Sequence, residues 1–202
     1  YGPRSVLWSE RPGPFSDMSK ALMRGLGSPN YCTHDDACAH NVNQASYSLT
    51  GHGRGKWIYD FKNCRHIVVQ GRNFLESLKV GELNQVLDAL DKGCRLTCVD
   101  VRPTVTGLKA QQNLCIRPGT DLALNLAVLH VLIEEKLYDA AYVERYVQDF
   151  EALADFVRPY SPQWAESQCD IPADVIAELA RSLAAAAPQV IWHGGWMSTR
   201  YP

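Results

Sequence analysis

The sequence predicts an α/β fold, in which a Rossmann-like, doubly wound and mostly parallel sheet is flanked by helices. Residues 67–70 form a short run rich in β-branched side chains, and residues 95–99 form a second predicted strand. Between them, residues 82–91 place leucine and valine at helical spacing. A strand, a crossover helix and a second strand in so short a span form a βαβ unit, whose strands are parallel and whose crossover is right-handed.

The first 30 residues are divided by turn-forming residues. Glycine and proline are concentrated at residues 2–3, 11–14 and 25–29. These breaks leave room for one short helix, which we predict over residues 17–25.

The remainder of the chain is predicted to be mainly helical. Residues 121–135 form a strongly apolar helix with little polar face, which we expect to be mostly buried. Pro188 ends the last long helix, and the apolar residues after it predict a third strand. The other predicted segments are the helices 140–148, 150–157, 161–167 and 173–186 and the strand 190–192.

Length and composition fit one large α/β domain or slightly more. The chain has 202 residues, of which 46% are hydrophobic, so it can bury a sizeable core. It begins with Tyr1 instead of methionine, and its first residues lack the layout of a signal peptide. We therefore expect an internal segment of a larger multidomain subunit. We predict an approach segment with a metal-ligand loop over residues 1–45 and a nucleotide-binding domain over residues 46–202.

The charge distribution argues against nucleic acid and anionic membranes as partners. The 20 basic and 22 acidic residues give a net charge of −2 and are well mixed along the chain. No apolar run is long enough to predict a membrane-spanning helix.

Glycine, acidic and basic residues follow the predicted strands. In a doubly wound sheet, ligands bind outside the carboxyl ends of the strands, so these loops should converge on one crevice that suits a nucleotide. The residues after the first strand are Gly71, Arg72 and Asn73; those after the second are Asp100, Arg102 and Thr104; those after the third are His193, Gly194 and Gly195.

Individual roles follow from residue chemistry. Asp100 is placed to accept hydrogen bonds from ribose hydroxyls, and the backbone at Gly71 could approach a pyrophosphate closely. Arg72 and Arg102 could bind phosphate. The loop after the first strand lacks the second and third glycines of the Gly-x-Gly-x-x-Gly fingerprint, which argues against ordinary nicotinamide cofactors. Glycines and aspartates at strand ends also cap helices, so a purely structural role stays open.

A second group of reactive side chains lies within residues 31–40, where two thiols, two imidazoles and two carboxylates occur together. A thiolate such as Cys38 suits zinc or a heavier redox metal. The seven cysteines of the chain include no repeated Cys-x-x-Cys pair, which disfavours zinc. An irregular loop without a ligand is the other alternative.

Four motifs in this order resemble those of one family, the dimethyl sulfoxide reductase superfamily of molybdopterin enzymes. The chain is most similar to the catalytic subunits of thiosulfate and polysulfide reductases within it. The motifs are Gly27-Ser28-Pro29-Asn30 followed eight residues later by Cys38, the loop 69–77, the loop 99–106 and the loop 116–121. One departure concerns the third motif, where Val101 stands in place of the family's usual proline and Pro103 follows the arginine.

The resemblance implies a molybdenum or tungsten ion bound by two molybdopterin guanine dinucleotides, with the Cys38 thiolate as its protein ligand. It implies that Asp121 pairs with a guanine base, and that His34 or His40 orients the substrate or moves protons. It also implies an iron–sulfur cluster in a missing N-terminal part. The positions carried over as cofactor contacts besides those of the strand-end loops are Glu76, Pro118, Gly119 and Asp121.

The resemblance implies that the full-length protein reduces a sulfur oxyanion or polysulfide in anaerobic respiration. The present segment alone is expected to be inactive. Formate dehydrogenases, arsenate reductases and nitrate reductases share these loops and remain alternatives. A nucleotide-binding module without a metal and a zinc-organised interaction module are further alternatives. The implied partners are the remainder of the catalytic chain, an iron–sulfur electron-transfer subunit, a membrane anchor subunit and a small inorganic substrate. The implied location is periplasmic and membrane-associated.

Overall fold

The computed structural model describes residues 1–34, 38, 40–53, 57–78 and 80–195. The chain divides into two compact units, Tyr1–Trp57 and Ile58–Pro202, and each is described by itself. A division after residue 45, as predicted from the sequence, would fall within the helix His40–Thr50.

The first unit is small and contains a two-stranded parallel sheet of β1 and β2. The predicted helix over residues 17–25 is confirmed, whereas the two strands were not predicted. The elements are η1 (Pro3–Ser5), β1 (Trp8–Glu10), α1 (Ser16–Gly25), β2 (Tyr31–Thr33) and α3 (His40–Thr50).

The segment between α1 and β2 ties this unit together. The Ser28 hydroxyl donates to the backbone oxygen of Val6 at 2.7 Å, and the Asn30 amide donates to that of Arg4 at 2.6 Å. Gly27 takes a positive φ of 74°, which favours glycine. The Gly-Ser-Pro-Asn motif therefore holds the N-terminal segment against β2.

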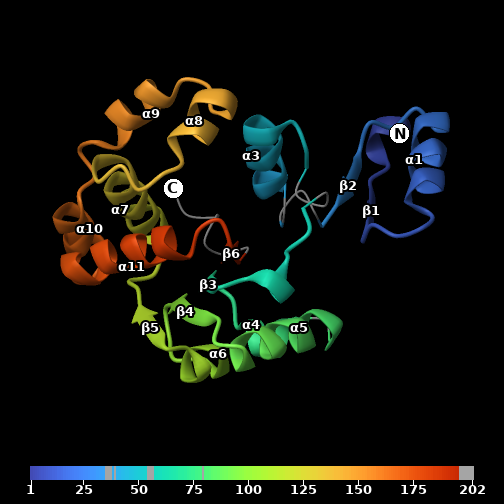
Figure 1. The fold of residues 1–202 in the computed structure, drawn as a ribbon. Helices are drawn as coiled ribbons and strands as arrows, with labels where there is room; N and C mark the ends of the chain where they lie inside the picture. Colours follow the sequence, from blue (N-terminus) through green and yellow to red (C-terminus); the bar gives the residue numbers. More distant parts are fainter. Residues whose placement is uncertain (35–37, 39, 54–56, 79, 196–202) are drawn as a thin grey trace. The chain divides into compact units, whose positions relative to one another are not determined.

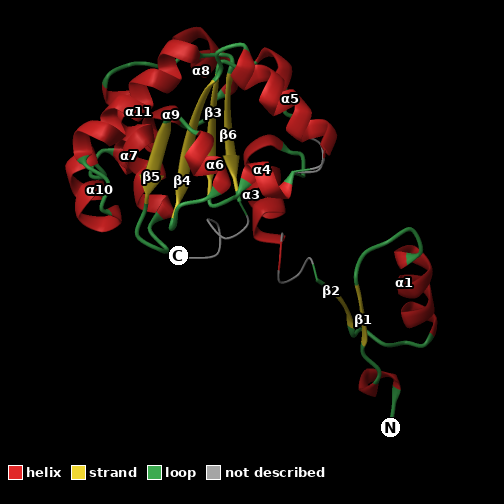
Figure 2. Ribbon diagram, turned by 90° about the horizontal axis from the view of Figure 1, so that it is seen from below, coloured by secondary structure: helices red, strands yellow, loops and turns green. Residues whose placement is uncertain are grey.

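The second unit confirms the predicted parallel sheet. Its strands are β3 (His66–Gln70), β4 (Arg95–Asp100), β5 (Gln112–Cys115) and β6 (Val190–Gly194), in the order β5-β4-β3-β6, and all neighbours are parallel. The chain proceeds from β3 outward to β5 and then returns to place β6 on the other side of β3 (Figures 1 and 2). The order of the strands reverses between β3 and β6, so a ligand crevice is expected at the carboxyl ends of these two strands.

Helices cover both faces of this sheet. Figure 1 shows α4, α5 and α6 on one side and α7, α10 and α11 on the other. All six helices predicted in this part are confirmed, with ends that differ by a few residues. The helices are α4 (Phe74–Ser77), α5 (Val80–Asp91), α6 (Val105–Lys109), α7 (Asp121–Glu134), α8 (Ala140–Tyr146), α9 (Phe150–Val157), α10 (Pro162–Cys169) and α11 (Ala173–Ala186). None of the helices in the described ranges is both long and apolar enough to cross a lipid bilayer.

The helix α7 is less buried than its composition suggested. Seven of its 14 residues are buried, whereas Leu122 is 54% exposed. A helix that lies on a sheet turns one side toward it, so an all-round apolar sequence still leaves some side chains in solvent.

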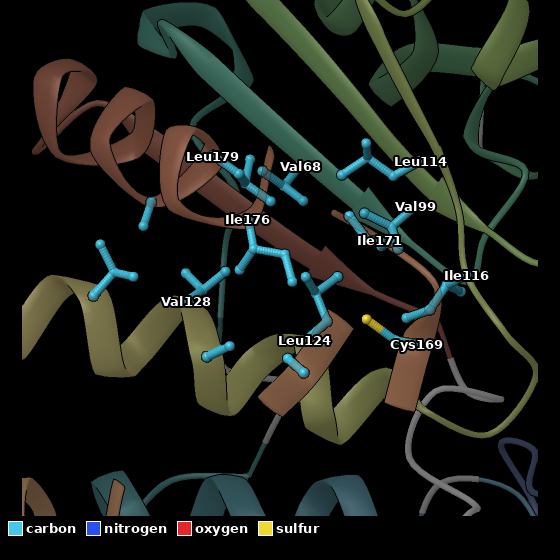
Figure 3. Close-up of a cluster of buried hydrophobic side chains, with 14 of the residues drawn as sticks. Val68, Val99, Leu114, Ile116, Leu124, Val128, Cys169, Ile171, Ile176 and Leu179 are labelled. Atoms are coloured by element: carbon cyan, nitrogen blue, oxygen red, sulfur yellow. The ribbon is translucent and has the colours of Figure 1, made fainter. Parts of the chain in front are cut away.

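Alternation along β3 builds two cores. Val68 points to the face covered by α7, α10 and α11, where it lies in one cluster with Leu124 and Ile176 (Figure 3). Ile67 and Val69 point to the opposite face and belong to the second cluster. Side chains of a strand alternate between the two faces, so the middle of a strand buried on both sides is apolar, as it is in β3.

Ile176 of α11 is fully buried in the first of these cores. Replacing it by valine removes one methylene and leaves a small cavity, and we expect the free energy of unfolding to fall by about 1 kcal/mol. Chemical denaturation measures this change. Ala177→Ser on the same helix, at a partly buried position, is the control and should change stability less; a larger loss in the control would contradict the assigned packing of α11.

Candidate functional site

The loops after β3 and β6 meet at the carboxyl edge of the sheet. The backbone nitrogen of Gly195 donates to the oxygen of Gln70 at 2.6 Å, and that of Gly71 donates to the oxygen of Val99 at 2.8 Å. A Cβ atom at Gly195 would lie 2.1 Å from the backbone oxygen of Gly71. Gly71 itself has a φ of +63°. The two glycines therefore allow a close backbone contact at the point where the strand order reverses, with Gly195 buried and Gly71 half-buried.

Arg72 and His193, predicted from different strand ends, lie together here. The Arg72 guanidinium donates to the Ser77 hydroxyl at 3.1 Å and contacts Nε2 of His193 at 3.2 Å. Because arginine keeps its protons, Nε2 of His193 is the acceptor and the ring proton lies on Nδ1. The ring of buried His193 lies 4.5 Å from that of Tyr59 and 5.0 Å from that of Phe74. His193 and Gly194 belong to β6 itself, which extends further than the predicted strand.

Asp100 lies at the end of β4 and is half-buried. One of its carboxylate oxygens accepts from the backbone nitrogen of Val101 at 2.8 Å. Arg102 is exposed and donates to the backbone oxygen of Pro103 at 3.2 Å. Asp100 can therefore still accept hydrogen bonds from a ligand, and the Arg102 guanidinium faces solvent.

Three other predicted contact residues bind within the chain. The Asn73 side chain accepts from the Thr106 hydroxyl at 2.9 Å and donates to the Glu76 carboxylate. The Thr104 hydroxyl accepts from the backbone nitrogen of Gly107 at 3.0 Å and so caps α6. These side chains connect the loop after β3 with the loop after β4. Thr106, which is fully buried, was not selected from the sequence.

The loop between β5 and α7 is held by an ion pair. Arg117 donates to both carboxylate oxygens of Asp170, at 2.9 and 2.5 Å. The Thr120 hydroxyl donates to the backbone oxygen of Arg117 at 2.7 Å. Gly119 has a φ of +81°, and Pro118 is exposed. This anchoring fixes the start of α7.

Asp121 is the first residue of α7 and is 8% exposed. Burial raises the pKa of its carboxyl group, and the nearby charge of Asp100 acts in the same direction, while a hydrogen bond from Gln70 opposes them. Gln70 is held in turn, because the Trp192 indole donates to its side-chain oxygen at 2.8 Å. No lysine or arginine within the described ranges forms an ion pair with Asp121. A buried carboxylate without a cation suits a ligand that presents N–H donors.

The raised pKa of Asp121 leads to a stability prediction. The folded protein holds the carboxyl proton more tightly than the unfolded chain does, so stability falls as pH rises above the ordinary value of 3.8. Asp121→Asn removes this cost. We expect a higher melting temperature than wild type at pH 7, with a difference that shrinks as the pH approaches 3.

Thermal denaturation at the two pH values measures this effect. Asp88→Asn, at an exposed position on α5, is the matched control and should leave the melting temperature nearly unchanged. A lower melting temperature for Asp121→Asn at pH 7 would show that the ionised carboxylate is stabilised by its surroundings.

The residues predicted at the metal end belong to the first unit. Cys38 is half-buried, and His34 and His40 are exposed. The side chain of His40 contacts that of Gln44 at 3.5 Å. The intervening residues 35–37 and 39, including two carboxylates of the predicted cluster, lie outside the described residues. Among the residues that are described, no group of three or more His, Cys, Asp or Glu side chains forms a metal site, which gives the zinc alternative no support there.

Comparisons with known proteins agree on one family. The family model "Molybdopterin oxidoreductase" matches residues 17–196. The molybdopterin-containing subunit of thiosulfate reductase from Salmonella typhimurium is 39% identical over 199 residues, which are 98% of this chain and 26% of that protein. Acetylene hydratase from Syntrophotalea acetylenica is 31% identical over 189 residues, or 89% of this chain and 23% of that protein.

The fold agrees with a solved structure of similar type. The structure of acetylene hydratase from Pelobacter acetylenicus superposes with a TM-score of 0.82 at 27% identity, over 98% of this chain and 27% of that chain. The chain thus spans about a quarter of the length of the relatives that it matches.

Proposed function

The chain belongs to the molybdopterin oxidoreductase family, and from this membership we propose that it forms one guanine dinucleotide-binding lobe of a catalytic subunit and supplies the cysteine ligand of the metal. The cofactor of this family is a molybdopterin that carries molybdenum or tungsten. The guanine dinucleotide form, with two pterins for each metal ion, is part of our proposal.

The observation that carries this proposal is the carboxyl edge between β3 and β6. Gly71 is half-buried there, and Gly195 is buried against it so closely that a Cβ atom at Gly195 would clash with the oxygen of Gly71. Gly71 has no side chain, so its backbone allows a pyrophosphate to approach closely. The Arg72 guanidinium, oriented by Ser77 and His193, supplies positive charge beside it.

Asp121 supports guanine as the base. The Watson–Crick edge of guanine presents two N–H donors, and a carboxylate can accept both. Adenine presents a ring-nitrogen acceptor at the corresponding position, which a carboxylate would repel. Burial strengthens this discrimination because neither group can turn to water. Asp100, at the end of β4, is placed for the hydroxyls of a ribose.

At the metal end, we assign the thiolate ligand to Cys38. When bound, the metal and its pterins supply two-electron redox chemistry, while protein groups bind and position the reactants. His34 and His40 flank Cys38 in the sequence and are exposed, so either imidazole can hold a substrate oxyanion or transfer a proton at a ring nitrogen.

For the full-length protein we propose reduction of a sulfur oxyanion or polysulfide in anaerobic respiration. The 39% identity to a thiosulfate reductase subunit supports this choice. Relatives named as an arsenate respiratory reductase, 28% identical, and a formate dehydrogenase, 30% identical, keep those two substrates as alternatives. An iron–sulfur cluster elsewhere in the full-length chain, an iron–sulfur electron-transfer subunit, a membrane anchor subunit and a periplasmic location complete the proposal.

Metal and nucleotide analysis of the full-length protein tests the proposal. We expect molybdenum or tungsten by elemental mass spectrometry and, after acid hydrolysis, two guanine nucleotides for each metal ion. Reductase assays with thiosulfate, polysulfide, arsenate and formate then rank the substrates. Zinc as the only metal would favour an interaction module, and a nucleotide without any metal would favour a simple nucleotide-binding domain.

A further inference from the structure

Two thiols lie together at the amino edge of the sheet, the edge opposite the proposed cofactor site. Cys64 precedes β3 and Cys94 precedes β4. Both are buried, with exposed fractions of 8% and 4%, and both belong to the core cluster on the α5 face. Both cysteines line one cavity. The Cys64 thiol donates to the backbone oxygen of His66 at 3.1 Å and the Cys94 thiol to that of Arg95 at 3.6 Å, and the two thiols also interact with each other.

The backbone around the two thiols is fixed by hydrogen bonds. The Arg95 nitrogen donates to the Arg65 oxygen at 2.9 Å, and the Arg65 nitrogen donates to the Gln189 oxygen at 2.8 Å. These bonds continue the pairing of β3 with its two neighbours. The backbone positions of Cys64 and Cys94, at the starts of two paired strands, are therefore fixed by the strand register.

Small molecules can reach this thiol pair. An open cavity of about 480 Å³ is lined by both cysteines, and Cys64 also lines a neighbouring cavity of about 380 Å³. The larger cavity is positively charged, because four basic side chains line it and Glu178 is its one acidic residue. The basic residues are Lys62, Arg65, Lys92 and Arg95. A reagent with negative charge is therefore favoured.

We propose that Cys64 and Cys94 form a dithiol site that reacts with small anionic disulfides and closes to an intramolecular disulfide. The site is separate from the cofactor edge, so the proposal does not depend on the function assigned above. The oxidant is the small disulfide itself, such as glutathione disulfide.

The reaction balances as two thiol–disulfide exchanges. The Cys64 thiolate attacks one sulfur of the small disulfide; a protein–sulfur bond forms, the disulfide bond breaks, and one thiolate leaves. Cys94 then gives up its proton and attacks the Cys64 sulfur, which releases the second thiolate. Two protein thiols are oxidised, one small disulfide is reduced to two thiols, and the two protein protons end on these products.

Cys64 is the attacking thiol in this scheme. Cys64 lines both cavities, so a small disulfide can reach it from two sides, whereas Cys94 lines the larger one. The interaction with Cys94 lowers the pKa of Cys64, and the same interaction together with burial raises that of Cys94. A thiolate is the nucleophile in disulfide exchange, so the first attack falls to Cys64.

Peptide mapping of the full-length protein after treatment with glutathione disulfide tests the proposal. Chymotrypsin is preferred, since trypsin would cleave after Lys62, Arg65, Lys92 and Arg95 and leave peptides too short to map. The expected product is a linked pair of peptides with Cys64 and Cys94. Free Cys64 and Cys94 beside a glutathione adduct on exposed Cys115 would overturn the proposal.

Variants separate the steps. Cys94→Ser should stop the reaction at a glutathione adduct on Cys64, whereas Cys115→Ser should leave the link unchanged.

Lys92→Gln should slow closure with anionic glutathione disulfide by about fivefold, the effect of one unit charge at close range in water, and leave the rate with neutral hydroxyethyl disulfide unchanged. The anionic preference would be refuted if Lys92→Gln changed the rate with glutathione disulfide no more than the rate with hydroxyethyl disulfide. Peptide mapping of the wild-type protein decides whether the link between Cys64 and Cys94 forms, even where a variant fails to fold.

Discussion

Replacing Cys38 by alanine is expected to reduce the reductase activity of the full-length protein by at least about 100-fold. Changing a residue that only supports a metal ligand typically costs 10- to 100-fold in metal affinity or activity, and the loss of the ligand itself should cost more. Alanine has no atom that can replace the thiolate. Elemental analysis and a reductase assay on the same preparation would show whether activity falls with metal content or independently of it.

Cys32→Ala is the matched control for this experiment. Cys32 lies six positions earlier, is also half-buried, and pairs with Ser9 through its backbone in β2, which alanine can maintain. We expect activity close to that of wild type. If Cys32→Ala were as inactive as Cys38→Ala while both proteins folded, the ligand assignment would be wrong. Cys38→Ser, which retains a possible oxygen ligand, should keep more metal than Cys38→Ala.

The sequence was most informative where hydrophobic periodicity is strong. Residues 67–70 and 96–99 are buried and mostly apolar, which is the pattern expected for central parallel strands. The long helices α7 and α11 were predicted for the same reason. When one element is buried against another, both carry apolar residues at the positions in contact.

The edge strand β5 was missed because it carries little of that signal. Its sequence Gln-Asn-Leu-Cys contains one buried residue, Leu114, and the strand is only four residues long. β1 and β2 have three residues each, and none of them is buried. Their strand conformation comes from pairing with residues distant in the sequence, which local propensity cannot report.

At the candidate site, the sequence predicts which loops lie together more directly than it predicts what each side chain in them contacts. Strand ends in a parallel sheet must converge, so Gly71, Arg72 and His193 could be grouped from their positions along the chain. Asn73 and Thr104 are predicted to contact a ligand, and in the structure their side chains also hold neighbouring loops together. Polar residues after a strand serve either purpose, and their sequence positions are the same in both cases.

The sequence indicates no separate role for the Gln70 side chain, for a related reason. It ends an apolar strand and is 1% exposed, which from the sequence alone reads as the limit of β3. Its importance comes from Trp192 and Asp121, which are more than 50 positions away and reach it only through the order of the strands. A buried polar side chain requires partners, and such partners become visible in three dimensions.

Gly195→Val is expected to cause the largest loss of stability among the substitutions considered. The new Cβ atom would lie 2.1 Å from the backbone oxygen of Gly71 and 3.2 Å from that of Gln70. Neither atom belongs to a flexible side chain, so the loops after β3 and β6 must separate. The hydrogen bond from the Gly195 nitrogen to the Gln70 oxygen would be lost with that movement. We expect the free energy of unfolding to fall by about 3 kcal/mol, at the upper end of the usual cost of overpacking.

The same movement should affect nucleotide binding, because it would displace Gly71, whose backbone is proposed to lie against the pyrophosphate. We therefore expect the full-length Gly195→Val protein to retain much less guanine nucleotide than wild type after purification. Gly81→Ala in α5 is the matched control: nothing lies within 4 Å of its new Cβ atom, and alanine in a helix should stabilise by up to about 1 kcal/mol. Loss of stability without loss of nucleotide would separate the two roles of Gly195, since it would mean that the pyrophosphate lies away from the contact between the two loops.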